Sequence, residues 1–265
     1  VTLLTAWRLY PDTKLLEISL LDIGQGDAIL IEAPQGQVIL VDGGPDTKVL
    51  RRLGEELPFW EKNIDLIVLT HPHEDHLGGL ISVLDRYRVG AVMISGVMAT
   101  SNSYKHFLEV ISDKNIPLIL IQQTESIAFD DVRLEILYPQ SSFKARRISN
   151  LNNSSIVMKV VYKDIELLLT GDAEEAEEKE LLASGVNIEA DILKAGHHGS
   201  ETSSSEDFVK AVDPKLVLIS DGAGNSYGHP SPRTLKRFER LNIPVRRTDL
   251  ESTIHINTDG YTIYE

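Results

Sequence analysis

A dense group of metal-ligand side chains stands between an apolar strand and a helical segment. The six positions from His71 to His76 hold three histidines, one glutamate, one aspartate and one proline. Imidazole nitrogens and carboxylate oxygens suit zinc, manganese and iron, and a short turn after a strand can direct neighbouring side chains toward two adjacent ions. A solvated polar loop is the alternative interpretation, but surface loops rarely concentrate histidine so densely. The segment therefore predicts a metal site.

Acidic or histidine residues follow three other apolar strands. The strands over 38–41, 167–169 and 192–193 lead, in that order, into Asp42, Asp172 and the pair His197 and His198. Sites gather beyond the carboxyl ends of strands in parallel and mixed sheets, so segments far apart in the sequence can converge there. Taken singly, Asp42 also fits a common turn, and Asp172 also fits a helix N-cap. Together the strand ends predict one shared site.

The sequence leaves alternatives open for the roles of the other histidines. Of the adjacent pair, His198 fits a metal ligand and His197 a position facing the substrate, although the reverse order is also open. His229 precedes a helix, where an active-site rim and a plain turn fit equally well. We expect His106, on a helix, and His255, on a short strand, to be structural.

Composition limits the chemistry and the partners. The chain has no cysteine, which excludes disulfides, thiolate zinc sites and a cysteine nucleophile. Its 26 basic and 40 acidic residues give a formal charge of −14, which argues against attraction of nucleic acid or anionic lipid by bulk electrostatics. At 42% hydrophobic and 25% charged residues it is an ordinary globular chain. No apolar run approaches the roughly 20 residues of a membrane helix.

Hydrophobic periodicity predicts an α/β fold with mixed sheets. Antiparallel strands come first, strands and helices then alternate, and the second half repeats this order. Two such halves predict a four-layer αβ/βα sandwich, in which two mixed sheets pack face to face with helices on the outer faces. The expected strands cover 16–21, 28–33, 38–41, 64–69, 91–94, 118–121, 132–137, 156–162, 165–169, 191–193 and 216–219, with short strands to the end; the expected helices cover 46–57, 77–86, 104–113, 173–183, 206–212 and 232–241.

The sequence predicts a single domain over residues 1–265. No linker rich in proline, glycine or serine, no low-complexity segment and no internal repeat divides it. It starts at Val1 without an initiator methionine or a signal or transit peptide. We therefore expect a segment of a longer protein, with an artificial start as the alternative.

Several segments carry a resemblance to known families. In chain order, four of them resemble the metallo-β-lactamase fold superfamily: Asp42-Gly43-Gly44, Thr70-His71-Pro72-His73-Glu74-Asp75-His76-Leu77-Gly78-Gly79, Thr170-Gly171-Asp172 and Gly196-His197-His198-Gly199-Ser200. This resemblance spans nearly the whole chain, and its His-x-His-x-Asp-His element is highly specific. Three segments also resemble the C-terminal domain of ComEC, the membrane channel for DNA uptake in competent bacteria: Leu21-Asp22-Ile23-Gly24-Gln25-Gly26-Asp27-Ala28, Lys194-Ala195-Gly196-His197-His198-Gly199-Ser200 and Tyr227-Gly228-His229-Pro230.

The superfamily resemblance implies two divalent metal ions and assigns their ligands. His71 and His73 would bind one ion, and Asp75, His76 and one of His197 and His198 would bind the other. Asp172 would bridge the two ions. Asp42 would orient the ligands from behind. The superfamily usually has another histidine just before the strand that leads to Asp172, where this chain has an asparagine-rich stretch over 150–155. Asn153 can coordinate only weakly or through water, so Mn²⁺ fits the looser site as well as Zn²⁺.

The expected activity is metal-dependent hydrolysis of DNA during uptake, including degradation of the strand that is not imported. Two ions can lower the pKa of a bound water and neutralise charge on a phosphodiester. Asp75 or Asp172 would orient the metal-activated hydroxide. His229, or the non-ligating member of the pair His197 and His198, would donate a proton to the leaving oxygen.

Expected substrate contacts come from hydroxyl and basic side chains. Ser200 and Thr202 would donate hydrogen bonds to phosphate. Two basic groups could follow a phosphate backbone, with ordinary surface as the alternative for both: residues 144–147, which include Arg146 and Arg147, and the group Lys236, Arg237, Arg240, Arg246 and Arg247. The acidic run over 174–180 indicates a solvated helix face. We expect weak, salt-sensitive binding of DNA.

Two other functions remain open. One is hydrolysis of a small ester, lactam or cyclic phosphodiester, since a fold does not fix its substrate. The other is a non-catalytic DNA-binding or scaffolding module, against which the nearly complete ligand set argues. The resemblance further implies that the partner is the remainder of a multi-pass bacterial membrane channel, with this domain on the extracytoplasmic side. We expect the isolated domain to be monomeric.

Overall fold

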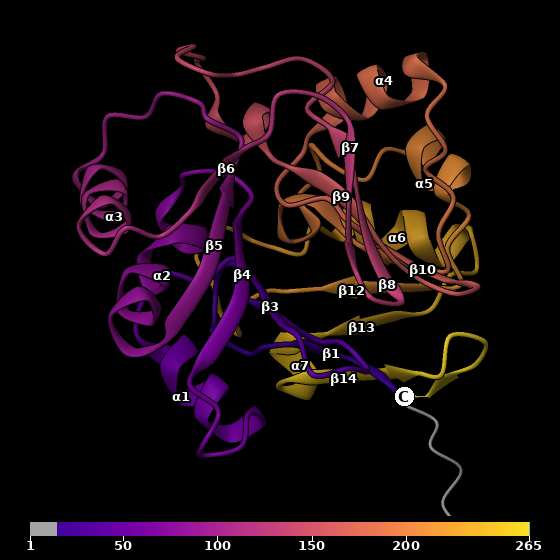
Figure 1. Ribbon diagram of the computed structural model, residues 1–265. Helices are drawn as coiled ribbons and strands as arrows, with labels where there is room; N and C mark the ends of the chain where they lie inside the picture. Colours follow the sequence, from indigo (N-terminus) through magenta and orange to yellow (C-terminus); the bar gives the residue numbers. More distant parts are fainter. Residues whose placement is uncertain (1–14, 265) are drawn as a thin grey trace, which may run out of the picture.

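Two mixed β-sheets lie face to face in the computed structural model, which describes residues 15–264 (Figure 1). The first sheet has the order β15-β14-β1-β2-β3-β4-β5-β6, with bounds β1 Leu16–Leu20, β2 Ile29–Glu32, β3 Val38–Val41, β4 Asn63–Leu69, β5 Arg88–Ile94, β6 Leu118–Leu120, β14 Ile254–Thr258 and β15 Ile263–Tyr264. The second has the order β13-β12-β11-β10-β9-β8-β7, with bounds β7 Glu125–Phe129, β8 Val132–Tyr138, β9 Val157–Tyr162, β10 Ile165–Leu169, β11 Ile192–Lys194, β12 Leu216–Ile219 and β13 Val245–Arg247.

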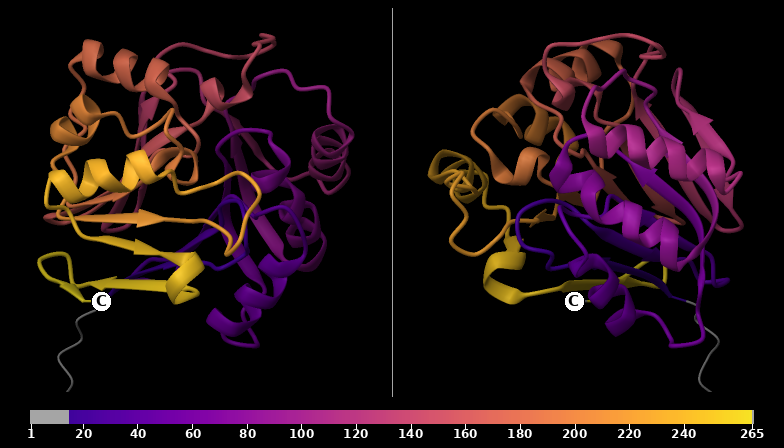
Figure 2. Two further views of the ribbon diagram at one scale, coloured as in Figure 1. Left: turned by 180° about the vertical axis from the view of Figure 1, so that it is seen from behind. Right: turned by 90° about the vertical axis from the view of Figure 1, so that its left-hand side faces the viewer.

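Helices cover the outer face of each sheet (Figure 2). The first sheet carries α1 Lys48–Glu56, α2 Glu74–Arg86 and α3 Asn102–Asp113, and the second carries α4 Glu175–Ser184, α5 Glu206–Val212 and α6 Pro232–Arg240. The short elements are α7 Thr248–Glu251 and the 3₁₀ turns η1 Leu151–Ser154 and η2 Gly196–Gly199. The predicted four-layer αβ/βα sandwich is confirmed. Within residues 15–264 we find no helix with the length and apolar character to cross a bilayer.

Three apolar layers hold the sandwich together, and the alternation of each strand divides its side chains between them. In β2, Ile29 and Ile31 enter the core between the sheets, whereas Leu30 enters the layer under α1, α2 and α3. Neighbouring side chains of a strand point to opposite faces, so a strand covered on both sides must be apolar throughout. This explains why the central strands form continuous apolar runs rather than alternating ones.

The direction of the strands places the predicted ligand segments together. β3, β4, β5 and β6 run parallel to one another, as do β10, β11, β12 and β13. Asp42 and His71 therefore follow neighbouring strands of the first sheet, and Asp172 and His197 follow neighbouring strands of the second. Both pairs of strand ends face the same opening of the sandwich.

The predicted elements differ from the structure in a few places. Strands 38–41, 165–169 and 216–219 and the helix over 206–212 have the expected bounds. Helix α2 begins at Glu74 rather than at 77, which puts Asp75 and His76 in its first turn. β7 was not predicted, because its exposed edge position leaves no clear apolar alternation. The expectations about the chain's start fall on residues 1–14, outside the described residues.

The expected solvated face over 174–180 is wrong for two of its glutamates. Glu177 and Glu178 are buried. Both carboxylate oxygens of Glu178 accept backbone N–H groups, from Ser204 and Ser205, and the Glu177 carboxylate accepts the backbone N–H of Glu174 at 3.0 Å. Burial raises the pKa of both carboxyl groups. These contacts fix α4 against the loop that follows His197 and His198.

Candidate metal centre

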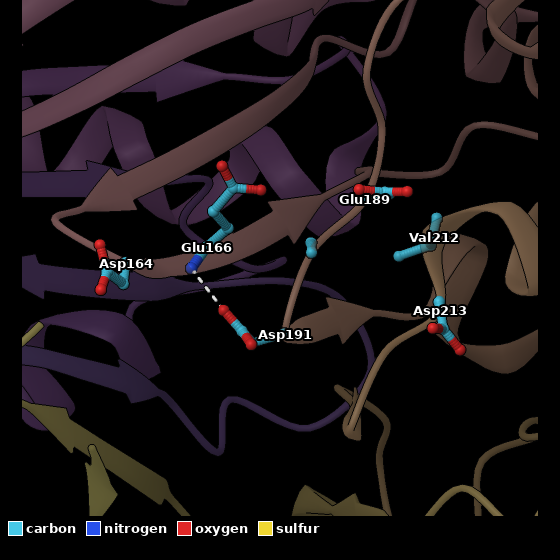
Figure 3. Close-up of a pocket in the computed structure, with 7 residues that line it drawn as sticks. Asp164, Glu166, Glu189, Asp191, Val212 and Asp213 are labelled. Atoms are coloured by element: carbon cyan, nitrogen blue, oxygen red, sulfur yellow. Dashed lines mark hydrogen bonds between the residues drawn. The ribbon is translucent and has the colours of Figure 1, made fainter. Parts of the chain in front are cut away.

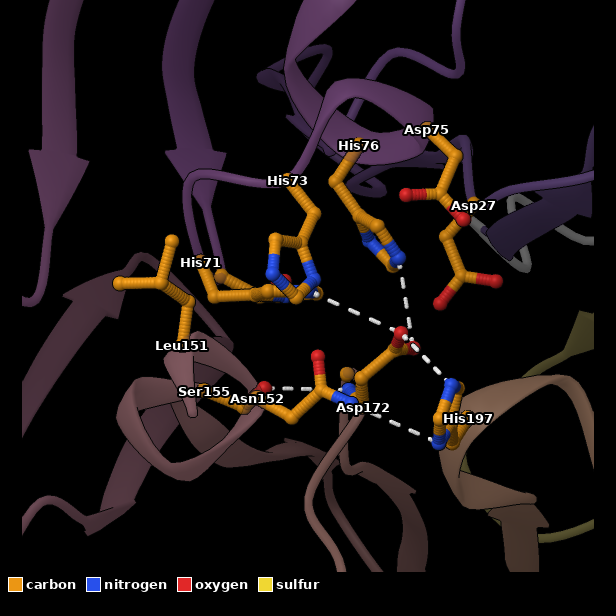
Figure 4. A network of polar contacts seen from close by, with 12 residues as sticks. Asp27, His71, His73, Asp75, His76, Leu151, Asn152, Ser155, Asp172 and His197 are labelled. Carbon is orange, nitrogen blue, oxygen red and sulfur yellow. Dashed lines mark hydrogen bonds and ion pairs between the residues drawn. The ribbon is translucent and has the colours of Figure 1, made fainter. Parts of the chain in front are cut away.

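The Asp172 carboxylate lies between two groups of possible metal ligands (Figure 4). Its Oδ2 is 3.7 Å from His71 Nε2, while its Oδ1 is 3.3 Å from His76 Nε2 and 3.5 Å from His198 Nε2. The first group consists of His71, His73 and Asp172, and the second of Asp75, His76, Asp172 and His198. Within each group the ligand atoms all lie within 4.8 Å of one another. The structure thus brings together all six residues that we expected to bind metal.

Close backbone packing places the ligands of α2. The Gly79 N–H donates to the Gly44 carbonyl at 2.9 Å, and the Gly43 N–H donates to the His76 carbonyl at 2.7 Å. A Cβ at Gly79 would lie 2.0 Å from the Gly43 oxygen, so only glycine allows this approach. The glycines after His76 therefore bring the start of α2 against the Asp42 loop.

Asp42 orients His76 from behind. Its Oδ2 is 2.8 Å from His76 Nδ1, and the carboxylate also accepts the backbone N–H and the hydroxyl of Thr70, at 2.8 and 2.7 Å. A carboxylate on one ring nitrogen fixes the tautomer and directs the other nitrogen toward a metal. Here Nε2 of His76 faces Asp172. This contact is the geometry that the expected orienting role of Asp42 requires.

A buried ion pair stands behind His198. The Nδ1 atom of His198 is 3.0 Å from the Ser220 carbonyl and 3.3 Å from Asp27 Oδ1. The other oxygen of Asp27 pairs with the Lys194 ammonium, and both of these side chains are 1% exposed. Sequence reasoning missed this pair, although Asp27 and Lys194 both lie in segments that carry the ComEC resemblance. A lysine within an apolar strand was the available signal.

The two ligand groups have opposite electrostatic character. Burial alone would lower the pKa of His76 and of His198. The carboxylates of Asp172 and Asp42 instead raise the pKa of His76 well above its usual value. Those of Asp172 and Asp27 raise the pKa of His198 to about 9. Burial and the neighbouring His76 hold the pKa of His71 well below its usual value, and burial also lowers that of His73. Burial alone would raise the pKa of Asp172, but the imidazoles of His76 and His198 hold it well below its usual range.

The buried polar atoms of this cluster fit bound cations. His76 Nε2, Asp172 Oδ1 and His198 Nε2 are buried, and none has a hydrogen-bond partner among residues 15–264. An unsatisfied buried polar atom costs about 1–3 kcal/mol, yet three of them face one another here. A divalent ion would satisfy all three, and imidazole and carboxylate donors suit Zn²⁺ and Mn²⁺. The residues present therefore fit a two-metal site that shares Asp172.

Metal binding should release protons, and its affinity should rise with pH up to about pH 9. Neighbouring carboxylates raise the pKa of His198 to about 9 and that of His76 well above its usual value, so both imidazoles hold a proton more tightly than a free histidine does. A metal binds only the neutral imidazole, so protons compete with it below pH 9. Calorimetric titration at pH 7 in buffers of different ionisation enthalpy should count about two protons released. Binding without proton release would contradict the raised pKa values.

The two adjacent histidines have different positions. The His198 side chain is 1% exposed and belongs to one ligand group, whereas that of His197 is 25% exposed at the rim. His197 Nδ1 is 3.2 Å from Glu174 Oε1, and its Nε2 is 3.9 Å from Asp172 Oδ2. Both residues have positive φ, 47° and 52°, so the backbone turns sharply enough to separate their rings. The structure therefore favours His198 as the ligand.

Asn152, from the stretch where the resemblance led us to expect another histidine, lies beside the cluster. The Asn152 amide lies 3.5 Å from His197 Nδ1 and 3.4 Å from Glu174 Oε1, and Figure 4 shows its side chain beside Asp172. Its Oδ1 is buried without a partner in the described chain, as is that of Asn153. We expected Asn153 at this place, but the contacts to the cluster come from Asn152. Sequence reasoning also missed Glu174, which we had assigned to a solvated face.

Of the expected substrate-binding residues, Ser200 and Thr202 lie at this rim, beside Glu174. Ser200 Oγ and Thr202 Oγ1 are 3.1 Å apart, and the Thr202 hydroxyl donates to Glu174 at 3.0 Å. Arg146 and Arg147 are exposed on the loop before η1, and no ion pair joins either of them to a carboxylate of residues 15–264. In the C-terminal basic group, by contrast, Arg237, Arg240, Arg246 and Arg247 contact carbonyls or carboxylates of the protein itself.

His229 lies beside the two adjacent histidines. Its ring centroid is 5.3 Å from that of His197 and 6.4 Å from that of His198. Burial and the neighbouring His197 lower its pKa, which disfavours the imidazolium that a proton donor requires. His106 and His255 lie elsewhere, beside Glu109 at 3.7 Å and Ser19 at 3.1 Å respectively.

A second group of carboxylates lines a hollow at the amino ends of β10, β11 and β12 (Figure 3). The acidic residues are Asp164, Glu166, Glu189, Asp191 and Asp213, around about 300 Å³. Asp191 accepts the Glu166 N–H at 3.0 Å and the Lys215 ammonium at 2.7 Å. None of these carboxylates belongs to a converging ligand group found in the described residues. The metal site is therefore at the opposite, carboxyl ends of the strands.

This fold and ligand arrangement define a metallo-hydrolase class. A model of the metallo-β-lactamase superfamily matches residues 21–220, and the chain belongs to that superfamily.

Three curated relatives are named as competence, ComE operon or recombination proteins. The chain is 31% identical over 255 residues to ComE operon protein 3 of Bacillus subtilis (strain 168), an alignment that covers 90% of this chain and 32% of that protein. It is 27% identical to competence protein ComA of Neisseria gonorrhoeae, over 89% of this chain and 31% of that protein. It is 28% identical to recombination protein 2 of Haemophilus influenzae, over 91% and 29%. The chain spans about a third of the length of these relatives.

Solved structures share the fold at low sequence identity. The diiron β-hydroxylase CmlA from Streptomyces venezuelae aligns with a TM-score of 0.58 and 14% identity, over 92% of this chain and 54% of that one. The metallo-β-lactamase fold protein YhfI from Bacillus subtilis aligns with a TM-score of 0.55 and 12% identity, over 94% and 99%. At these identities the likeness shows the common fold alone.

Proposed function

We propose that this domain hydrolyses DNA phosphodiester bonds with two divalent metal ions, Mn²⁺ or Zn²⁺, during DNA uptake. The observation that carries the proposal is the Asp172 carboxylate, which faces one ligand group with each oxygen. Relatives named as competence proteins support DNA as the substrate.

The side chains have distinct roles in this proposal. His71, His73 and Asp172 would hold one ion, and Asp75, His76, Asp172 and His198 the other. The ions would supply Lewis-acid activation of water and neutralise charge on the phosphate. Asp75 is 32% exposed, against 2% for Asp172. Burial alone would raise the pKa of the Asp75 carboxyl group, but the His198 imidazole, whose Nε2 is 3.4 Å from Oδ2, and the charge of His76 lower it, so Asp75 remains ionised. Asp75 can therefore accept a hydrogen bond from the attacking water and orient it.

Contacts with the DNA would come from the rim. Arg146 and Arg147 are exposed and would bind phosphate, whereas the charge of −14 keeps the intrinsic affinity low. The proposal therefore needs DNA to be delivered by the remainder of a multi-pass membrane protein. This domain would lie on the extracytoplasmic side and would be monomeric by itself. It would degrade the strand that is not imported.

Digestion of end-labelled DNA by the purified domain tests the activity and its polarity. We expect cleavage with Mn²⁺ or Zn²⁺, none with chelator, and a loss on the order of 100-fold for Asp75→Ala, because the metal supplies several kcal/mol of charge stabilisation. Asp85→Ala is a matched control on the same helix, where Asp85 is an exposed partner of Lys114. Cleavage that Asp75→Ala leaves unchanged would refute the two-metal nuclease, and turnover of small phosphodiesters alone would replace its substrate.

A further inference from the structure

The loop over 220–231 joins β12 to α6 (Figure 2), and its His229 ring lies beside those of His197 and His198. It contains His229, and two residues before it stands Tyr227, which is 69% exposed. The proposed hydrolysis gives no role to this tyrosine. A single exposed aromatic side chain is ordinary by itself, so the case for Tyr227 depends on what its ring contacts.

A single asparagine side chain fixes the shape of this loop. The Asn225 amide nitrogen donates to Gly222 O at 3.0 Å, to His229 O at 2.6 Å and to Asp221 Oδ1 at 3.3 Å. Its amide oxygen accepts the backbone N–H groups of Tyr227, at 3.0 Å, and His229, at 3.2 Å. The loop that carries Tyr227 therefore has a fixed backbone, so a ligand that binds there does not lose free energy in ordering the loop.

Three aromatic rings connect the surface to the metal centre. The Tyr227 and His229 rings are stacked, with centroids 6.1 Å apart and planes 27° from parallel. The His229 ring meets the His197 ring edge to face, at 5.3 Å and 76°. His197 Nε2 is in turn 3.9 Å from Asp172 Oδ2. The rings of Tyr227, His229 and His197 would thus form a continuous path between a planar group stacked on the exposed face of Tyr227 and Asp172.

We propose that Tyr227 stacks a nucleobase of single-stranded DNA next to the phosphodiester at the metal centre. This rests on the proposed function and adds a substrate class to it, since bases in a duplex are already stacked on one another. Stacking on an aromatic side chain accepts every base and needs no positive potential. It therefore suits a domain of charge −14, which cannot gather DNA by its electrostatic field.

Binding of a single-stranded oligonucleotide that contains 2-aminopurine tests the stacking directly, since its fluorescence falls on stacking. The measurement is made with chelator, so that no cleavage occurs. We expect Tyr227→Ala to weaken binding by about 5- to 150-fold, which corresponds to ~1–3 kcal/mol, and to reduce the quenching. Tyr227→Trp should retain both. Tyr261→Ala is the matched control, because Tyr261 is a comparably exposed tyrosine, at 64%, on the turn after β14.

An abasic oligonucleotide of the same length separates stacking from phosphate contacts. Wild type and Tyr227→Ala should bind it equally, and an equal loss on both oligonucleotides would overturn the proposal. If Tyr227→Ala binds and cleaves base-bearing DNA as wild type does, stacking is refuted while the nuclease stands. If no DNA is cleaved but Tyr227→Ala still weakens base-dependent binding, the nuclease is refuted and stacking stands.

Discussion

Replacing Asp172 with alanine should reduce metal-dependent DNA cleavage on the order of a thousandfold and impair binding of both metal equivalents. Each carboxylate oxygen faces a different ligand group, with Oδ2 3.7 Å from His71 Nε2 and Oδ1 3.3 Å from His76 Nε2. Removing it takes one donor from each group and also the carboxylate that faces the Nε2 atoms of His71, His76 and His198. Metal analysis after dialysis and calorimetric titration with Mn²⁺ or Zn²⁺ would measure the loss.

Asp164→Ala is the matched control for this substitution. Asp164 is exposed just before β10, and Asp172 follows the carboxyl end of the same strand. We expect the control to bind two metal equivalents and to cleave as wild type does. An Asp172→Ala protein that still bound two ions tightly would show that the sites do not share this ligand.

Lys194→Met should strongly destabilise the fold, by about 3–5 kcal/mol. The pair of Lys194 with Asp27 is buried on both sides, each side chain being 1% exposed. The Lys194 ammonium and the His198 imidazole outweigh burial and lower the pKa of Asp27 to about 2. The substitution would leave a buried carboxylate with only His198 as its charged partner. Urea unfolding at pH 7 in chelator would measure the change in the free energy of unfolding.

Lys159→Met gives the comparison that isolates burial. Lys159 is also 1% exposed, but its partner Glu166 is 29% exposed and can be hydrated after the substitution. We expect a clearly smaller loss for Lys159→Met. The double variant Asp27→Asn with Lys194→Met should recover much of the stability that Lys194→Met loses. Equal losses for the two lysine variants would mean that packing, and not charge, accounts for the effect.

Local periodicity predicted the four layers, and the strand-end residues predicted a shared site, while the superfamily resemblance assigned its six candidate ligands. A strand such as β10 is a continuous apolar run that ends at Thr170-Gly171-Asp172, and its bounds follow from that contrast. The adjacent positions of Asp75 and His76 on α2 follow from a strand that turns into a helix within a few residues. Ligands on one short turn must lie close together, whatever the rest of the chain does.

The features that sequence reasoning missed depend on contacts between distant segments. Asn152 rather than Asn153 contacts the cluster because a 3₁₀ turn decides which side chain faces inward. Lys194 meets Asp27 across 167 positions of sequence, between the two sheets. Glu178 looks like a surface residue in its helix, but it is buried by the loop at Ser204 and Ser205. None of these can be derived from the residues next to them.

The order of strands in the first sheet has a consequence for how the chain matures. β14 pairs with β1, from Leu16 opposite Thr258 to Leu20 opposite Ile254. A growing chain would therefore carry β1 as an open edge until almost all of this domain had left the ribosome. Pairing across so long a separation is slow, because the whole intervening chain must be organised first. The candidate metal ligands end at His198, so all of them would be synthesised before this edge of the first sheet is covered.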